Sequence, residues 1–106
     1  MSNFDTVKKF LESFPLENIH FKQHFYERTL ERPISEELVK KYIKQTDRLL
    51  QVEEQPARNP AEEKYKIWIK LSYKYSLVLV ITISRKALYI LMGWNTDRKW
   101  QKSIQK

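Results

Sequence analysis

The feature that most constrains the fold is a pair of adjoining strand-like segments. From Tyr65 to Tyr73, apolar or aromatic side chains alternate with a second set that is mainly cationic or polar, which is the two-residue period of a half-buried strand. Residues 77–83 are apolar apart from Thr82 and rich in β-branched side chains, as expected of a central strand with both faces buried. We therefore expect a sheet that other elements cover.

The first fourteen residues predict an amphipathic helix that could supply this cover. Apolar side chains recur there at spacings of three and four residues, charged side chains lie between them, and Pro15 ends the pattern. The apolar positions are Phe4, Val7, Leu11 and Phe14. We expect a helix over residues 3–14 whose apolar stripe packs on the rest of the domain.

Two further helices are expected before the sheet. One covers about residues 22–32 and ends before Pro33, because the residue before a proline is disfavoured in the helical conformation. The next begins after Ser35, whose hydroxyl can accept a hydrogen bond from a free N–H group of the first turn. Its predicted buried stripe is Leu38, Val39, Tyr42 and Ile43, and its predicted solvent-facing side chains are Lys40, Lys41 and Lys44.

The rest of the chain supplies two more strands and a tail. Residues 49–54 predict a first strand, residues 55–63 an irregular loop with two prolines, and residues 86–94 a last strand. Residues 96–106 predict a short C-terminal helix. The expected fold class is α+β, with N-terminal helices packed on a mainly antiparallel, four-stranded meander sheet and a short C-terminal helix.

Composition excludes several classes of protein. The 106 residues suffice for a single domain, residues 1–106, and the absence of cysteine excludes disulfides, a thiol nucleophile and thiolate metal sites. Gly93 is the one glycine of the sequence, so glycine-rich nucleotide-binding loops are excluded as well. The longest apolar run is about a third of the roughly 20 residues that a membrane helix needs. We expect a cytoplasmic protein that binds no cofactor.

The charge of the chain is unevenly distributed. Residues 64–106 contain ten lysines or arginines and one acid, a balance of +9, whereas residues 1–63 carry −2, so that the sum is +7. A field confined to one half of a small protein can concentrate a polyanion on one surface, and nucleic acid is the commonest polyanion. The alternative is that lysine only keeps exposed strands soluble and unpaired.

The first candidate site is a row of side chains on the second predicted helix. His24, Arg28 and Arg32 are spaced by four residues and so share one side of a helix. An imidazole can transfer a proton near neutral pH, and guanidinium groups bind phosphate oxygens in pairs, which suits phosphodiester chemistry. Glu27 and Glu31 lie on the same helix, so an ordinary network of exposed ion pairs is the alternative.

A metal site is the weaker interpretation of the same segment. His20, His24 and Glu27 could place three ligands on one side of a helix. The segment lacks the glutamate of the helical His-Glu-x-x-His signature, and no fourth ligand is evident. We therefore expect no metal.

The second candidate site is a nucleic-acid-binding surface. Cationic and aromatic side chains are interleaved on the predicted outer side of one strand and again in the tail, so that phosphates can be neutralised and bases can stack. The residues are Lys66, Trp68, Lys70, Lys74, Arg98, Lys99, Trp100 and Lys102. The alternative is an exposed strand face on which lysine stems cover a tryptophan.

The segment from His24 to Val39 resembles a small, uncharacterised domain family that is grouped with the RelE and ParE toxins. It contains the pattern H-x-x-x-R-x-x-x-R-x-I-S-x-x-x-V, and residues 79–83, LVITI, match the core strand that follows in that family. The resemblance covers residues 19–100. The helix over residues 3–14 is additional, and residues 55–63 form a longer, partly acidic loop.

The resemblance implies a RelE-like fold and a metal-independent, toxin-type endoribonuclease, or a relative that binds RNA without cutting it. In that chemistry His24 would transfer the proton, Arg28 and Arg32 would stabilise the phosphate, and Lys66 and Lys70 would hold the substrate. An acidic, antitoxin-like protein is the partner that it implies. The alternatives are a non-enzymatic nucleic-acid-binding module and a protein-interaction domain whose lysines serve solubility alone.

Overall fold

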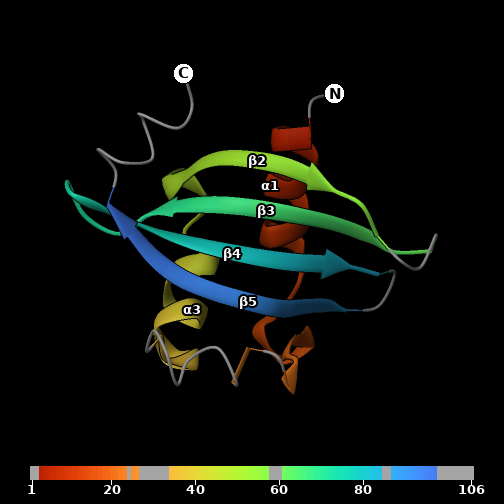
Figure 1. The fold of residues 1–106 in the computed structure, drawn as a ribbon. Coiled ribbons are helices and arrows are strands. Elements are labelled where there is room, and N and C mark those ends of the chain that lie inside the picture. Colours follow the sequence, from red (N-terminus) through yellow and green to blue (C-terminus); the bar gives the residue numbers. More distant parts are fainter. Residues whose placement is uncertain (1–2, 24, 27–33, 58–60, 85–86, 98–106) are drawn as a thin grey trace.

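The fold is α+β, as the sequence predicts. The computed structural model describes residues 3–23, 25–26, 34–57, 61–84 and 87–97. Within them, a five-stranded sheet carries helices α1 and α3 on one face (Figure 1). The elements are α1 (Asn3–Ser13), the 3-10 turn η1 (Leu16–Asn18), β1 (Ile19–Phe21), α3 (Glu36–Ile43), the 3-10 turn η2 (Thr46–Arg48), β2 (Leu49–Gln55), β3 (Glu63–Lys70), β4 (Tyr75–Ile83) and β5 (Leu88–Asp97).

The sheet has one strand more than predicted and is mixed. Its strand order is β1-β5-β4-β3-β2, in which β2 to β5 form the predicted antiparallel meander and β1 pairs with β5 in parallel. The prediction of four strands was wrong because β1 is only three residues long, too short to show a period. The C-terminal helix was predicted to begin at residue 96, but β5 continues to Asp97. Residues 98–106 lie outside the described part of the chain.

The core lies between the helices and one face of the sheet, which we call the inner face. Val7 and Leu11 of α1 are at most 1% exposed, and they pack in one cluster with apolar side chains of α3 and of the strands. The strand residues of this cluster are Ile19, Leu49, Tyr65, Ile67, Ile69, Leu77, Leu79, Ile81, Ile83, Leu88 and Ile90. In β3 these are the alternate positions that the sequence pattern assigns to the buried side.

Helix α3 begins as predicted. The Oγ of Ser35 accepts a hydrogen bond from the backbone N–H of Leu38 at 3.1 Å, which satisfies one of the free donors of the first turn. Val39 and Ile43 are buried, and the two other residues of the predicted stripe are half-buried. Of the second predicted helix, residues 23, 25 and 26 are helical, whereas Lys22 at its expected start is not; residues 24 and 27–32 lie outside the described part.

Lys44 links α1 to the end of α3, contrary to the prediction that it faces solvent. Its Nζ donates hydrogen bonds to the carbonyl oxygens of Leu11 at 2.7 Å, Glu12 at 3.0 Å and Phe14 at 2.7 Å. These carbonyls lie at the C-terminus of α1, where the last turn of a helix has acceptors without partners and a partial negative charge. The ammonium group therefore caps α1 and fixes it against the end of α3.

No helix in the described part of the chain has both the length and the hydropathy that crossing a membrane requires.

Candidate nucleic-acid interface

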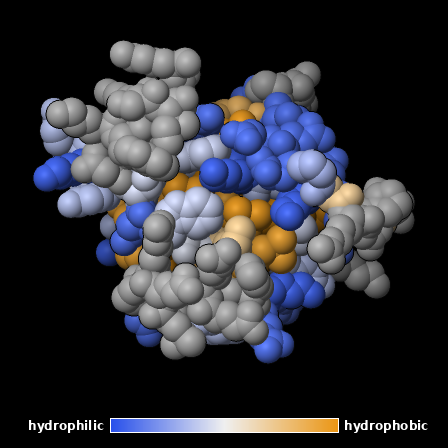
Figure 2. Space-filling model, in the orientation of Figure 1, coloured by the Kyte–Doolittle hydropathy of each residue, from blue (hydrophilic) through white to orange (hydrophobic). Residues whose placement is uncertain are grey.

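The face of the sheet opposite α1 and α3 is here called the outer face. It carries cationic side chains and an apolar band, which consists of Trp68, Val78, Val80, Met92 and Trp94. Side chains of paired residues in neighbouring strands lie on the same face, so the register sorts this face into four rows that cross the strands. The rows are Lys70, Ser76 and Thr96; Gln51, Trp68, Val78 and Trp94; Glu53, Lys66, Val80 and Met92; and Gln55, Lys64, Thr82, Tyr89 and His20. Figure 2 shows hydrophobic residues across the middle of this view and hydrophilic residues beside them.

Lys66 lies between two indole rings in the middle of the outer face. Its Nζ is 5.0 Å from the centroid of the Trp68 ring and 5.4 Å from that of Trp94. Such contacts attract an ammonium group to the ring face. Trp68 is only 8% exposed, so little of its ring is open for a base to stack on. The ammonium group of Lys66 lies over this ring, and its stem can cover apolar surface.

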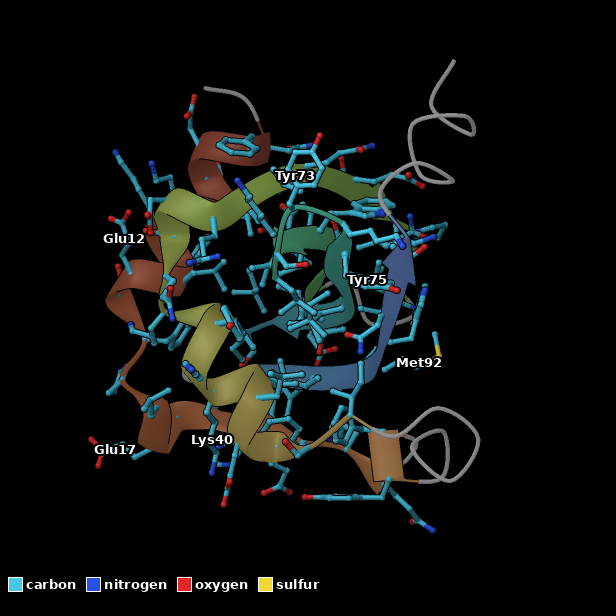
Figure 3. All side chains as sticks on the ribbon, turned by 90° about the vertical axis from the view of Figure 1, so that its left-hand side faces the viewer. Glu12, Glu17, Lys40, Tyr73, Tyr75 and Met92 are labelled. Carbon is cyan, nitrogen blue, oxygen red and sulfur yellow. The ribbon has the colours of Figure 1, made fainter. Side chains whose placement is uncertain are left out.

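The loop between β3 and β4 presents the exposed part of the predicted surface. We call Lys70, Tyr73, Lys74 and Tyr75 the hairpin tip. Both lysines are exposed, Tyr73 is 92% exposed and Tyr75 is 45% exposed. The Nζ of Lys74 lies 6.0 Å from the centroid of the Tyr75 ring. Figure 3 looks onto this end of the molecule and shows the two tyrosines on it.

The geometry of the turn explains why Tyr73 is exposed. The alternation along residues 65–73 predicts Tyr73 on the buried side, but β3 ends at Lys70 and the chain reverses. Ser72 fixes the turn, because its Oγ accepts hydrogen bonds from the backbone N–H groups of Lys74 at 3.3 Å and Tyr75 at 3.2 Å. The sequence signal that could have located this tip is the polar Ser72, three positions before the residue at which β4 begins.

Among the described residues of the four rows, one acid shares the outer face with the lysines. Glu53 of β2 is paired with Lys66 of β3, and its Oε1 accepts a hydrogen bond from the side-chain amide of Gln55 at 2.8 Å. An anionic ligand would therefore meet the least repulsion along β3, β4 and β5, away from β2.

The other predicted site residues lie outside the described part of the chain. This holds for all three candidate catalytic residues and for the tail of the predicted nucleic-acid surface. They are His24, Arg28, Arg32, Arg98, Lys99, Trp100 and Lys102. Within the described residues, no group of three or more histidine, aspartate or glutamate side chains is arranged to hold a metal ion.

Tyr65 shows the clearest electrostatic perturbation, and it lies on the inner face. Burial raises the pKa of Tyr65 to about 12. The hydrogen bond that its hydroxyl donates to Glu63 Oε2 at 3.0 Å, and the negative charges of Glu63 and Glu54, act in the same direction. The hydroxyl thus stays protonated beneath the sheet and takes no part in the outer face.

This raised pKa predicts a pH dependence of stability. An unfolded chain ionises the tyrosine near its ordinary pKa of 10, so the stabilisation is complete below pH 10 and is lost as the pH rises towards 12. We expect the difference in unfolding free energy between wild type and Tyr65→Phe to shrink by roughly 2 kcal/mol over that interval. Urea unfolding at several pH values measures it. Tyr73→Phe is the control, and a constant difference for Tyr65→Phe would contradict the prediction.

Comparison with known proteins identifies no relative of this chain. No family model matches the chain, and neither a curated protein nor a solved structure matches it significantly.

Proposed function

We propose that this chain binds nucleic acid, RNA in the first place, through the hairpin tip and the adjoining outer face of the sheet. The observation that carries the proposal is the exposure of Tyr73 and Tyr75 at the same hairpin tip as the exposed Lys70 and Lys74. Large aromatic rings that are exposed to water lack the favourable free energy of burial. Stacking of nucleic-acid bases on these rings would bury them and supply that free energy. The neighbouring ammonium groups would neutralise phosphates and release their counterions.

The choice of RNA rests on the resemblance to the RelE group. Two N-terminal helices on one face of a mixed, mostly antiparallel sheet are compatible with a RelE-like fold. We further propose, as the finer hypothesis, a metal-independent endoribonuclease in which His24 transfers the proton and Arg28 and Arg32 stabilise the phosphate. An acidic, antitoxin-like protein would cover the same lysines and compete with RNA for them.

Binding is tested by fluorescence anisotropy with a labelled single-stranded RNA at several salt concentrations. We expect the double variant Lys70→Ala/Lys74→Ala to bind roughly tenfold more weakly and to reduce the slope of log affinity against log salt by about 1.4, because each phosphate contact on a single strand contributes about 0.7. Lys8→Ala/Lys9→Ala, on α1 at the other side of the sheet, is the matched control and should leave both quantities unchanged. Failure of the wild type to bind at low ionic strength would refute the proposal.

Cleavage is tested on the same RNA in the presence of EDTA, with products separated on a gel. If the finer hypothesis holds, wild type produces fragments and His24→Ala produces them at least about 100-fold more slowly, the usual minimum contribution of a positioned acid or base. Equal cleavage by the two proteins would remove His24 from the mechanism. Binding without product would leave a nucleic-acid-binding module, the second candidate function.

A further inference from the structure

A second group of polar and aromatic side chains lies at the end of the outer face opposite the hairpin tip. It consists of His20, Lys22 and Tyr89, here called the far group. The Nζ of Lys22 is 4.4 Å from the centroid of the Tyr89 ring, and the rings of His20 and Tyr89 are 5.7 Å apart between centroids. His20 and Lys22 are exposed and Tyr89 is half-buried.

The parallel strand β1 is what brings this group onto the outer face. His20 is paired with Tyr89, which is paired with Thr82, which in turn is paired with Lys64. The far group therefore belongs to the row that contains Lys64, although His20 and Lys22 come from the less basic half of the sequence. The backbone N–H of Lys22 also donates to the carbonyl of Ile90 at 3.0 Å, which fixes this residue beside β5.

The two cationic ends are separated by the apolar band. Lys70 and Lys64 are six residues apart on β3, which corresponds to about 20 Å at the rise of a strand. Between them lie the rows that contain Trp68, Val78 and Trp94 and then Lys66, Val80 and Met92. A distance of about 20 Å spans roughly six phosphates at the 3.4 Å spacing of a stacked strand, and about half as many in an extended one.

We propose that His20, Lys22 and Tyr89 form a second phosphate-binding subsite, and that one strand of nucleic acid crosses the apolar band between it and the hairpin tip. This inference rests on the proposed function and adds to it a direction and a length. Lys22 donates to a phosphate oxygen, held in place by the Tyr89 ring, while the Tyr89 hydroxyl and the His20 imidazole supply further donors. Bases over the band contact Met92, Trp94 and the stem of Lys66.

Lysine at a sheet edge also discourages pairing with other chains, and that role needs no ligand. The length of the bound strand separates the two roles. A ligand that reaches from the hairpin tip to the far group gains contacts until it spans about 20 Å and then gains little more. If the far-group lysine serves solubility alone, removing it should change the affinity by the same factor for every oligomer length, and the length dependence should show no limit at about 20 Å.

The experiment measures affinity for labelled oligouridylates of 2, 3, 4, 6, 8 and 12 nucleotides. For wild type we expect affinity to rise steeply up to about three nucleotides if the bound strand is extended, or about six if it is stacked, and then to level off. The double variant His20→Ala/Lys22→Ala should lose less than twofold with the shortest oligomers and about tenfold with the 8-mer, and level off earlier. Lys22→Gln, which keeps most of the stem, should show a smaller loss of the same form; thermal melting confirms that each variant is folded.

The outcomes distinguish this inference from the proposed function. If His20→Ala/Lys22→Ala follows the wild-type length dependence while Lys70→Ala/Lys74→Ala weakens binding, the second subsite is refuted and the proposed function stands. If the far-group variant loses the same factor at every length, a general charge effect replaces the subsite. If wild type binds no oligomer, both the proposed function and the second subsite are refuted.

Discussion

Replacing Lys44 with methionine should lower the free energy of unfolding by about 3 kcal/mol. The substitution keeps most of the apolar stem and removes all three N–H donors. The carbonyl oxygens of Leu11, Glu12 and Phe14 would each lose a charge-assisted hydrogen bond of 2.7 to 3.0 Å. The carbonyls of Leu11 and Phe14 accept in part-buried positions, so water would replace the lost bonds only incompletely.

Urea unfolding followed by circular dichroism measures this loss. Lys41→Met is the matched control, because Lys41 lies exposed on the same helix and its removal should change the free energy by no more than about 0.5 kcal/mol. Equal stability of the two variants would show that Lys44 does not hold α1 to α3. Lys44→Arg should retain part of the stabilisation, since its guanidinium also donates to carbonyls.

Substituting the glycine of β5 should have the second large effect. A Cβ atom on Gly93 would lie 2.9 Å from Leu79 Cδ2 and 3.3 Å from Phe25 Cε2. Leu79 and Phe25 are at most 1% exposed, so neither side chain can move into solvent to make room. We expect Gly93→Ala to cost about 2 kcal/mol, in the range that overpacking of a core produces, and Gly93→Val more.

A double-variant cycle identifies the clash as the cause. Leu79→Ala alone creates a cavity and should cost about 3 kcal/mol. If the methyl group of Gly93→Ala occupies part of that cavity, the double variant should be more stable than the sum of the single effects predicts, by about 1 kcal/mol or more. Additive effects would contradict the clash as the cause, because the φ angle of Gly93 is not positive and other residues can adopt it. Urea unfolding of the four proteins provides the measurement.

Local patterns predicted most of the fold. The period of residues 65–73 and the apolar segment that follows define β3 and β4, and Ser35 marks the start of α3 because its cap requires only neighbouring residues. Strand β1 could not be predicted in this way. It consists of three residues, and its partner in β5 lies far away in the sequence.

The candidate site was predicted in part. Alternation shows which side of a strand a residue occupies, and it places Lys66, Trp68 and Lys70 correctly on the outer face. It does not show how other side chains pack over that residue, and so it does not predict that Trp68 is largely buried, with Lys66 of the same strand over its ring. Lys44 was assigned to solvent because its acceptors lie 30 to 33 residues away in the sequence, at the C-terminal end of α1.

The parallel pairing of β1 with β5 sets an order of events for folding. Ile19 and Leu88 are partners although 69 residues separate them, whereas β2 to β5 are joined by consecutive antiparallel pairings. Closing so long a loop costs more entropy than closing a hairpin, and a ribosome delivers residue 88 long after residue 19. We therefore expect the meander to assemble first and β1 to join it last. Until β1 pairs with β5, Ile19 and Phe21 are not packed in the sheet. The backbone N–H and C=O groups at the edge of β5 are then free to pair with a strand of another chain.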